Sequence, residues 1–109
     1  MTADDLEITP ATVVHVIYQA REGDAASAEL HEFIASLNDD EKAHLTAIAW
    51  VGRGAFEPED FAEALETAYA EATTPTEDYL MGMPHLAENL EAGLEALGID
   101  VSGEEEDFL

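Results

Sequence analysis

Glu41 and His44 are the two residues whose spacing most resembles that of a metal site. Their E-x-x-H spacing places a carboxylate and an imidazole on one face of a helix, as in the helical bundles that hold two iron ions between carboxylates. Such a site needs a second E-x-x-H pair and two further inward-facing glutamates, whereas the sequence contains one pair. Glu41 also suits the first turn of a helix. We therefore predict no metal site and no cofactor.

Arg53 is one of three Lys and Arg residues in the chain, and it stands between Gly52 and Gly54. A cation is favoured at the C-terminal end of a helix by the helix dipole. We expect Arg53 to tie such an end to the acidic start of the next helix, which contains Glu57, Glu59 and Asp60. The alternative is an anion site, in which the flanking glycines let a ligand approach the guanidinium group.

The usual catalytic motifs are missing from the sequence. There is no Cys, which excludes disulfides, thiolate metal sites and cysteine nucleophiles. Ser27, Ser36 and Ser102 do not lie in the G-x-S-x-G elbow of hydrolases. The stretch GRGAFEPED lacks the lysine of a phosphate-binding loop, and NDDE lacks the alternating ligands of a calcium loop. We therefore predict no catalytic residue, and the sequence does not favour an enzyme.

Large aromatic and sulfur-containing side chains form a second group of candidates. They are Trp50, Phe56, Tyr69, Tyr79, Met81 and Met83. Such side chains suit adaptable recognition surfaces. In an alanine-rich chain, the same side chains are also needed to fill the space between helices. Both interpretations stay open, and the residues that we predict as candidates for binding are Arg53, Trp50, Phe56, Tyr79, Met81 and Met83.

The acidic composition limits the class of partner. The chain has 26 Asp and Glu against three Lys and Arg, which gives a formal net charge of −23. Phosphate groups carry the same sign, so we expect no direct binding to nucleic acid or to an anionic membrane. A basic protein is the partner that this charge favours, with imitation of DNA as a special case. The acids also suit a solvated surface with no partner.

Helices have to position all these residues, because the apolar side chains recur at helical spacing. We predict helical segments over residues 9–22, 24–37, 38–52, 57–72, 74–82 and 84–97. The residues predicted to begin them are Thr9, Asp24, Asn38, Pro58, Thr74 and Pro84. Both Asn38 with Glu41 and Thr74 with Glu77 have the spacing of a capping box.

Glycines and a leucine stripe define where the predicted helices end and pack. Gly52 and Gly54 are both predicted to end the third helix, since glycine enters the left-handed conformation at little cost. The last helix carries an apolar stripe of Leu86, Leu90, Leu94 and Leu97. The fold class that we predict is all-α, a compact bundle of about five or six short helices.

One domain accounts for nearly the whole length of 109 residues. We expect a flexible N-terminal arm over residues 1–8, a single helical domain over residues 9–101, and a disordered acidic tail over residues 102–109. The N-terminal residues MTADDLEI do not resemble a secretory signal, and no segment is apolar enough to span a bilayer. We therefore expect a cytoplasmic protein. The sequence does not fix its oligomeric state.

Two long segments of the sequence resemble those of a known family. The segments LNDDEKAHLTAIAWVGRGAFEPEDF and TTPTEDYLMGMPHLAENLEAGLEALG resemble the two signature blocks of a family catalogued as domain of unknown function 3775. The resemblance spans about residues 37–98, and WVGRG and YLMGMP occur in the same order and spacing. It implies a short, free-standing, mainly helical bacterial protein. It assigns no activity and no functional residue.

These observations favour a small acidic helical module of the bacterial cytoplasm that binds a basic protein partner. The alternative is a small-molecule or metal-binding domain that uses Arg53, His44 and Glu41.

Overall fold

The computed structural model describes residues 6–71 and 74–99, without the side chain of Asp24. These residues form six α-helices and two short 3₁₀ helices, η2 and η3, with no strand among them, so the predicted all-α bundle is confirmed. In chain order the elements are α1 (Pro10–Arg21), η2 (Gly23–Ala26), α2 (Ser27–Ser36), α3 (Asp39–Arg53), η3 (Pro58–Asp60), α4 (Phe61–Ala70), α5 (Thr76–Met81) and α6 (Leu86–Ala96).

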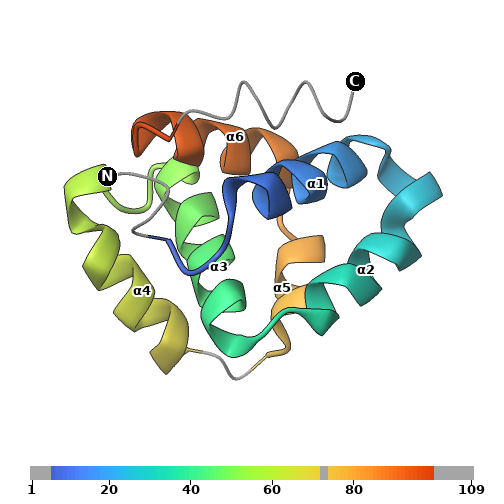
Figure 1. Ribbon diagram of the computed structural model, residues 1–109, viewed down its shortest axis with the longest axis horizontal. Helices are drawn as coiled ribbons and strands as arrows, with labels where there is room; N and C mark the ends of the chain where they lie inside the picture. Colours follow the sequence, from blue (N-terminus) through green and yellow to red (C-terminus); the bar gives the residue numbers. More distant parts are fainter. Residues whose placement is uncertain (1–5, 72–73, 100–109) are drawn as a thin grey trace.

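Helix α3 runs through the middle of the molecule, and the other helices pack around it (Figure 1). Its most extensive contact is with α6, and α4 lies against another side. Helix α1 packs on α6, and α2 packs on α5. Residues 43–51 of α3 are all buried, as expected for a helix that is surrounded by others.

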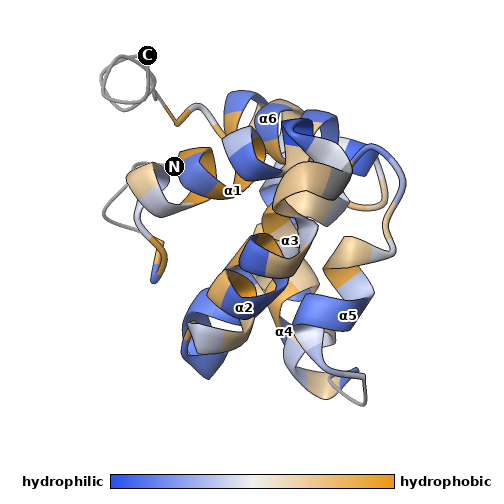
Figure 2. Cartoon of the chain, turned by 90° about the vertical axis from the view of Figure 1, so that its right-hand side faces the viewer, coloured by the Kyte–Doolittle hydropathy of each residue, from blue (hydrophilic) through white to orange (hydrophobic). Residues whose placement is uncertain are grey.

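The core is built from amphipathic helices that share one interior. Each labelled helix in Figure 2 carries both hydrophilic and hydrophobic residues. The predicted stripe on α6 is confirmed, because Leu86, Leu90, Leu94 and Leu97 are all buried. No helix within the described ranges has the length and apolar content needed to cross a membrane.

Local capping chemistry sets several helix ends as predicted. The Thr9 hydroxyl accepts a hydrogen bond from the Thr12 amide at the start of α1. At the start of α3, Asn38 and Glu41 form both hydrogen bonds of a capping box. Helix α3 ends at Gly54, whose φ of 86° is left-handed, and the Ala55 and Gly54 amides donate to the Trp50 and Val51 carbonyls.

The predicted helix starts at Asp24 and Thr74 are wrong. Helix α2 begins at Ser27 with Ala26 at its N-cap, because the chain first makes the 3₁₀ turn η2 after the left-handed Gly23; Asp24 lies within that turn. Helix α5 begins at Thr76 and has no side-chain cap. The predicted capping box of Thr74 and Glu77 is absent, because the Glu77 side chain is buried instead.

Gly52 and Pro84 also have roles different from those predicted. Gly52 does not end α3 but lies inside it, where α6 crosses so closely that a Cβ atom would lie 1.7 Å from the Asn89 backbone oxygen. Helix α6 begins at Leu86 rather than at Pro84, and His85 at its N-cap adopts a left-handed φ of 58°.

The predicted arm and tail fall mostly outside the described residues. Residues 1–5 of the arm and residues 102–109 of the tail are not described. Ile8, which the prediction assigned to the arm, is fully buried in the core, and Leu6 packs against that core. The packed part of the chain therefore begins before residue 9.

Candidate functional site

A groove of about 700 Å³ lies between α3, α4 and α5. Helix α3 contributes Asp39, Lys42, Thr46 and Trp50, helix α4 contributes Tyr69, and helix α5 contributes Tyr79. Helices α4 and α5 flank α3 without closing over it, and we call the space between them the α3–α4–α5 groove: Asp39 is exposed at its edge, whereas Thr46 and Trp50 are buried in its floor.

The spacing of residues on α3 explains how one helix can form the floor of the groove. The lining positions 39, 42, 43, 46 and 50 follow the spacing i, i+3, i+4, i+7 and i+11, which keeps them on one face. The capping box at Asn38 fixes where this helix starts, with the Asn38 amide donating to Glu41 at 2.9 Å. The register of the groove floor is thus set by local sequence.

Aromatic side chains join α3 to α5 in the groove. Trp50 donates a hydrogen bond from Nε1 to the Tyr79 hydroxyl at 2.8 Å, and the two rings meet nearly at right angles, with their centroids 6.4 Å apart. Phe56 stacks on Trp50 at a centroid distance of 5.8 Å. The structure therefore brings together three of the predicted binding residues in one aromatic cluster.

Two tyrosines dominate the exposed surface of the groove. Tyr69 is 47% exposed and Tyr79 is 38% exposed, and they are the exposed large hydrophobic side chains among the described residues. Both line the α3–α4–α5 groove, from α4 and α5 respectively. Isolated apolar side chains are common on protein surfaces, but the meeting of both in one concave site is informative.

Carboxylates surround this aromatic surface. The Tyr69 hydroxyl donates a hydrogen bond to Asp40, and Asp39 and Glu71 line the groove. The bond to the Asp40 carboxylate is the main cause that raises the pKa of Tyr69 to about 12, with smaller contributions from burial and from neighbouring acids. Tyr69 therefore stays protonated at neutral pH, and its hydroxyl orients the Asp40 carboxylate.

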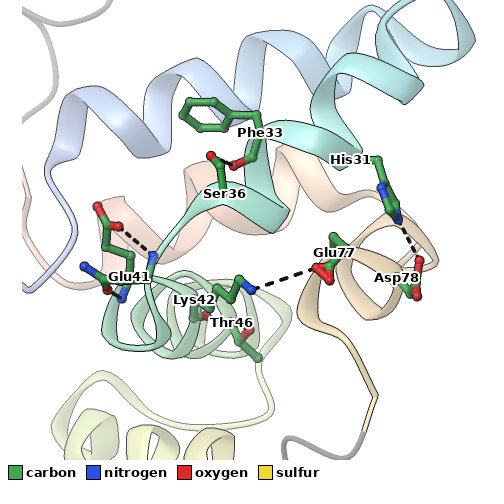
Figure 3. A network of polar contacts seen from close by, with 9 residues as sticks. His31, Phe33, Ser36, Glu41, Lys42, Thr46, Glu77 and Asp78 are labelled. Carbon is green, nitrogen blue, oxygen red and sulfur yellow. Dashed lines mark hydrogen bonds and ion pairs between the residues drawn. The ribbon is translucent and has the colours of Figure 1, made fainter.

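Lys42 is the cation that lines the groove, and its charge already has an acidic counterpart. Its Nζ lies 4.0 Å from Oε2 of Glu77, which is buried at 9% exposure (Figure 3). That Glu77 oxygen makes no hydrogen bond within the described residues, so Lys42 is its electrostatic partner. Close by, His31 Nε2 lies 2.7 Å from Asp78 Oδ1, which links α2 to α5.

The other predicted binding residues lie elsewhere. Met83 is buried at 8% exposure, and Met81 is half-buried; both line a different pocket, beside α1. The Arg53 side chain is exposed and makes no hydrogen bond or ion pair within residues 6–71 and 74–99. The predicted link from Arg53 to the acids of the next helix is therefore not formed among the residues that the structure describes.

The alternative site of Arg53, His44 and Glu41 is not assembled. Arg53 lies at the opposite end of α3 from Glu41, which is engaged in the capping box. His44 is buried, its Nδ1 donates to the Asp40 carbonyl at 2.9 Å, and its ring packs near Phe61. In the described part of the chain, no cluster of three His, Cys, Asp or Glu side chains is arranged to hold a metal.

The structure adds Lys42, Asp40 and Glu77 to the residues found by sequence reasoning. The face of α3 that lines the groove carries a signal in the sequence: Asp39, Lys42 and Thr46 recur at helical spacing, on the same face as Trp50. The sequence predicts a capping role for Glu77, and nothing in its local sequence distinguishes that role from burial opposite Lys42.

Comparison with protein families identifies one family whose model covers the groove. The family model described as protein of unknown function (DUF3775) matches residues 27–99, about two thirds of the chain. The chain belongs to this family. The matched region runs from α2 to α6, so it contains every residue of the α3–α4–α5 groove but leaves out α1. No curated protein and no solved structure matched the chain.

Proposed function

We propose that the protein is a small acidic interaction module that binds a basic segment of a partner protein in the α3–α4–α5 groove. The observation that carries this proposal is that Tyr69 and Tyr79, the exposed large hydrophobic side chains of the described residues, line one groove together. The bacterial cytoplasm is part of the proposal, and it rests on the resemblance to small bacterial proteins.

The chemistry of the groove suits a Lys or Arg side chain of a partner. A cation is attracted to the face of an aromatic ring within about 6 Å of its centre, and Tyr69 and Tyr79 offer such faces. Asp39, Asp40 and Glu71 supply carboxylates at or beside the groove. Lys42 opposes this charge only weakly, because Glu77 lies beside it.

The rest of the chain favours the same class of partner. A formal net charge of −23 attracts basic proteins over long distances and raises their rate of encounter. The groove then supplies what charge alone does not, which is a site with aromatic contacts and a defined shape. Binding should therefore depend on salt and also on particular side chains.

Trp50 provides a direct readout of binding. It is the single tryptophan of the chain, it lines the groove, and its indole is hydrogen-bonded to Tyr79. The probes are peptides selected against the protein from a random-sequence display library, and their affinity is measured from Trp50 emission at low and high salt. We expect the selected peptides to be rich in Lys and Arg and to bind more weakly at high salt.

Two matched double variants test whether the groove itself is responsible. Asp39→Asn with Glu71→Gln removes two charges from the groove, whereas Glu29→Gln with Glu95→Gln removes two charges from α2 and α6, also near helix ends. We expect the first pair to weaken binding about tenfold and the second about twofold or less. Equal weakening by both pairs, or selected peptides without basic residues, would sink the proposal.

A further inference from the structure

A second pocket lies beside the C-terminal end of α1, at the connection from α5 to α6. Its volume is about 370 Å³, and it shares no lining residue with the α3–α4–α5 groove. Met81, Met83 and His85 line it, and they alternate in the sequence as MGMPH. The chain has three methionines, so two of them lie in one pocket together with a histidine.

We propose that this pocket binds one Cu(I) ion through the thioether sulfurs of Met81 and Met83 and an imidazole nitrogen of His85. Soft thioether ligands select Cu(I), and imidazole suits copper as well, whereas Mg²⁺ and Ca²⁺ prefer oxygen ligands. Two of the three proposed ligands are thioethers, so the site differs from one built of His, Cys and carboxylate ligands.

The His85 ring is available for such a role. His31 pairs with Asp78, His44 donates to the Asp40 carbonyl, and His15 packs against Phe33. Within the described residues, by contrast, the His85 side chain has no hydrogen bond, ion pair or ring contact. A ring nitrogen of His85 can therefore bind a metal without breaking an existing interaction.

The backbone at His85 is a second, independent observation. His85 is the one described residue other than glycine with a positive φ, at 58°. Such a conformation is unfavourable for a residue with a Cβ atom, and residues held in it are concentrated at ligand-binding sites. Core packing accounts for Met81 and Met83, which contact the hydrophobic core, but it does not account for a strained histidine.

The charges around the pocket are compatible with a monovalent cation. Arg21 lines the pocket, but its guanidinium group donates to the Glu91 carboxylate at 2.5 Å, so its charge is matched. Glu88 also lines the pocket and leaves an excess of negative charge. The methionine side chains have three rotatable bonds each, which lets their sulfur atoms adjust to a bound ion.

The first experiment uses Ag(I) as a stable probe of Cu(I) chemistry. In protein labelled with ¹³C at the methionine methyl groups, Ag(I) should shift the signals of Met81 and Met83 and leave Met1 as an internal reference. Cu(I) affinity is then measured under reducing, oxygen-free conditions by competition with a coloured Cu(I) chelator. We expect one ion per chain, retained in excess Mg²⁺, and sulfur neighbours in X-ray absorption.

The variants separate metal binding from folding. Met81→Leu with Met83→Leu conserves core volume, and His85→Asn keeps a residue that tolerates the left-handed conformation. Each should weaken Cu(I) binding at least tenfold, whereas His31→Asn should leave it unchanged. Equal shifts at Met1, a copper site with only oxygen and nitrogen neighbours, or full affinity in both variants would each overturn the proposal.

Discussion

The two faces of α3 differ in how closely the neighbouring helices approach. On one face, Gly52 lies against the backbone of α6, and Gly93 of α6 lies against the Ile48 carbonyl, where a Cβ atom would come within 2.1 Å. On the other face, Lys42, Thr46 and Trp50 line an open groove of about 700 Å³. Helix α3 therefore has one face on which the contact with α6 leaves no room for a methyl group, and an opposite face that lines a groove with room for a ligand.

The face of α3 that contacts α6 supports the fold, whereas the face that lines the groove belongs to the candidate site. Close backbone packing through glycines holds α3 rigidly against α6, because no side chain can rearrange between them. On the opposite face, Thr46 and Trp50 of this fixed helix form the floor of the groove, and the exposed Tyr69 and Tyr79 stand beside it, which is the arrangement that a preorganised binding site needs. We therefore expect substitutions on the two faces to have different consequences.

The largest effect is expected at the crossing of α3 and α6. Gly52→Ala would place a Cβ atom 1.7 Å from the Asn89 backbone oxygen, and backbone cannot move aside as a flexible side chain can. We expect a loss of about 3 kcal/mol or more, against a total stability of roughly 5 to 15 kcal/mol for a domain of this kind. Urea unfolding followed by circular dichroism measures it.

Gly82→Ala is the matched control. Gly82 follows α5, has a φ of −84°, and a Cβ atom there would lie 3.5 Å from the Asp78 backbone oxygen, an ordinary contact. This variant should change stability by less than about 0.5 kcal/mol. If Gly52→Ala were tolerated as well as Gly82→Ala, the close crossing and the contrast between the two faces of α3 would be wrong.

At the crossing of α3 and α6, the sequence predicts the helix ends and the apolar stripe but not the role of Gly52. Caps and stripes were predictable because they depend on residues three or four positions apart, such as Asn38 with Glu41 and the leucines of α6. Gly52 and Gly54 look alike in the sequence. Gly54 ends the helix, whereas Gly52 leaves room for the close approach of α6. That distinction depends on the backbone at Asn89, some 40 residues further along the chain.

The candidate site was predictable only as a set of residue types. Trp50, Phe56 and Tyr79 were named because large aromatic side chains are few in this chain. Their assembly joins α3 to α5 across 29 residues, and the position of Lys42 beside Glu77 joins the same two helices. Local patterns do not report such pairings, so Met81 and Met83 were grouped with the aromatic residues although they line a different pocket.

A smaller effect is expected inside the groove when one hydrogen bond is removed. Tyr79→Phe keeps the ring but leaves the partly buried Trp50 Nε1 without its acceptor. We expect a loss of about 1 kcal/mol, at the low end for an unpaired donor because water can reach the groove. Trp50 emission should change at the same time, and both are measured in one urea titration.

Tyr69→Phe is the control for this groove variant. It removes the same atom from the other groove tyrosine, whose hydroxyl pairs with an exposed carboxylate, so the loss should be less than about 0.5 kcal/mol. A larger loss from Tyr69→Phe than from Tyr79→Phe would contradict the view that the bond between Trp50 and Tyr79 holds the groove together.

The smallest effect concerns proton binding at Tyr69. Its pKa is raised from 10.0 to about 12, chiefly by the hydrogen bond to Asp40. Because the folded pKa lies above the unfolded one, the stabilisation from this bond is fully present below pH 10 and is lost as the pH rises toward 12.

The difference in tyrosinate absorbance between wild type and Tyr69→Phe isolates this titration, with circular dichroism to confirm that the chain stays folded. Asp40→Ala should return the Tyr69 pKa toward 10.0. A wild-type difference curve already centred at 10.0 would mean that Tyr69 is not anchored to α3, and the exposed edge of the groove would then lose the contact that orders it.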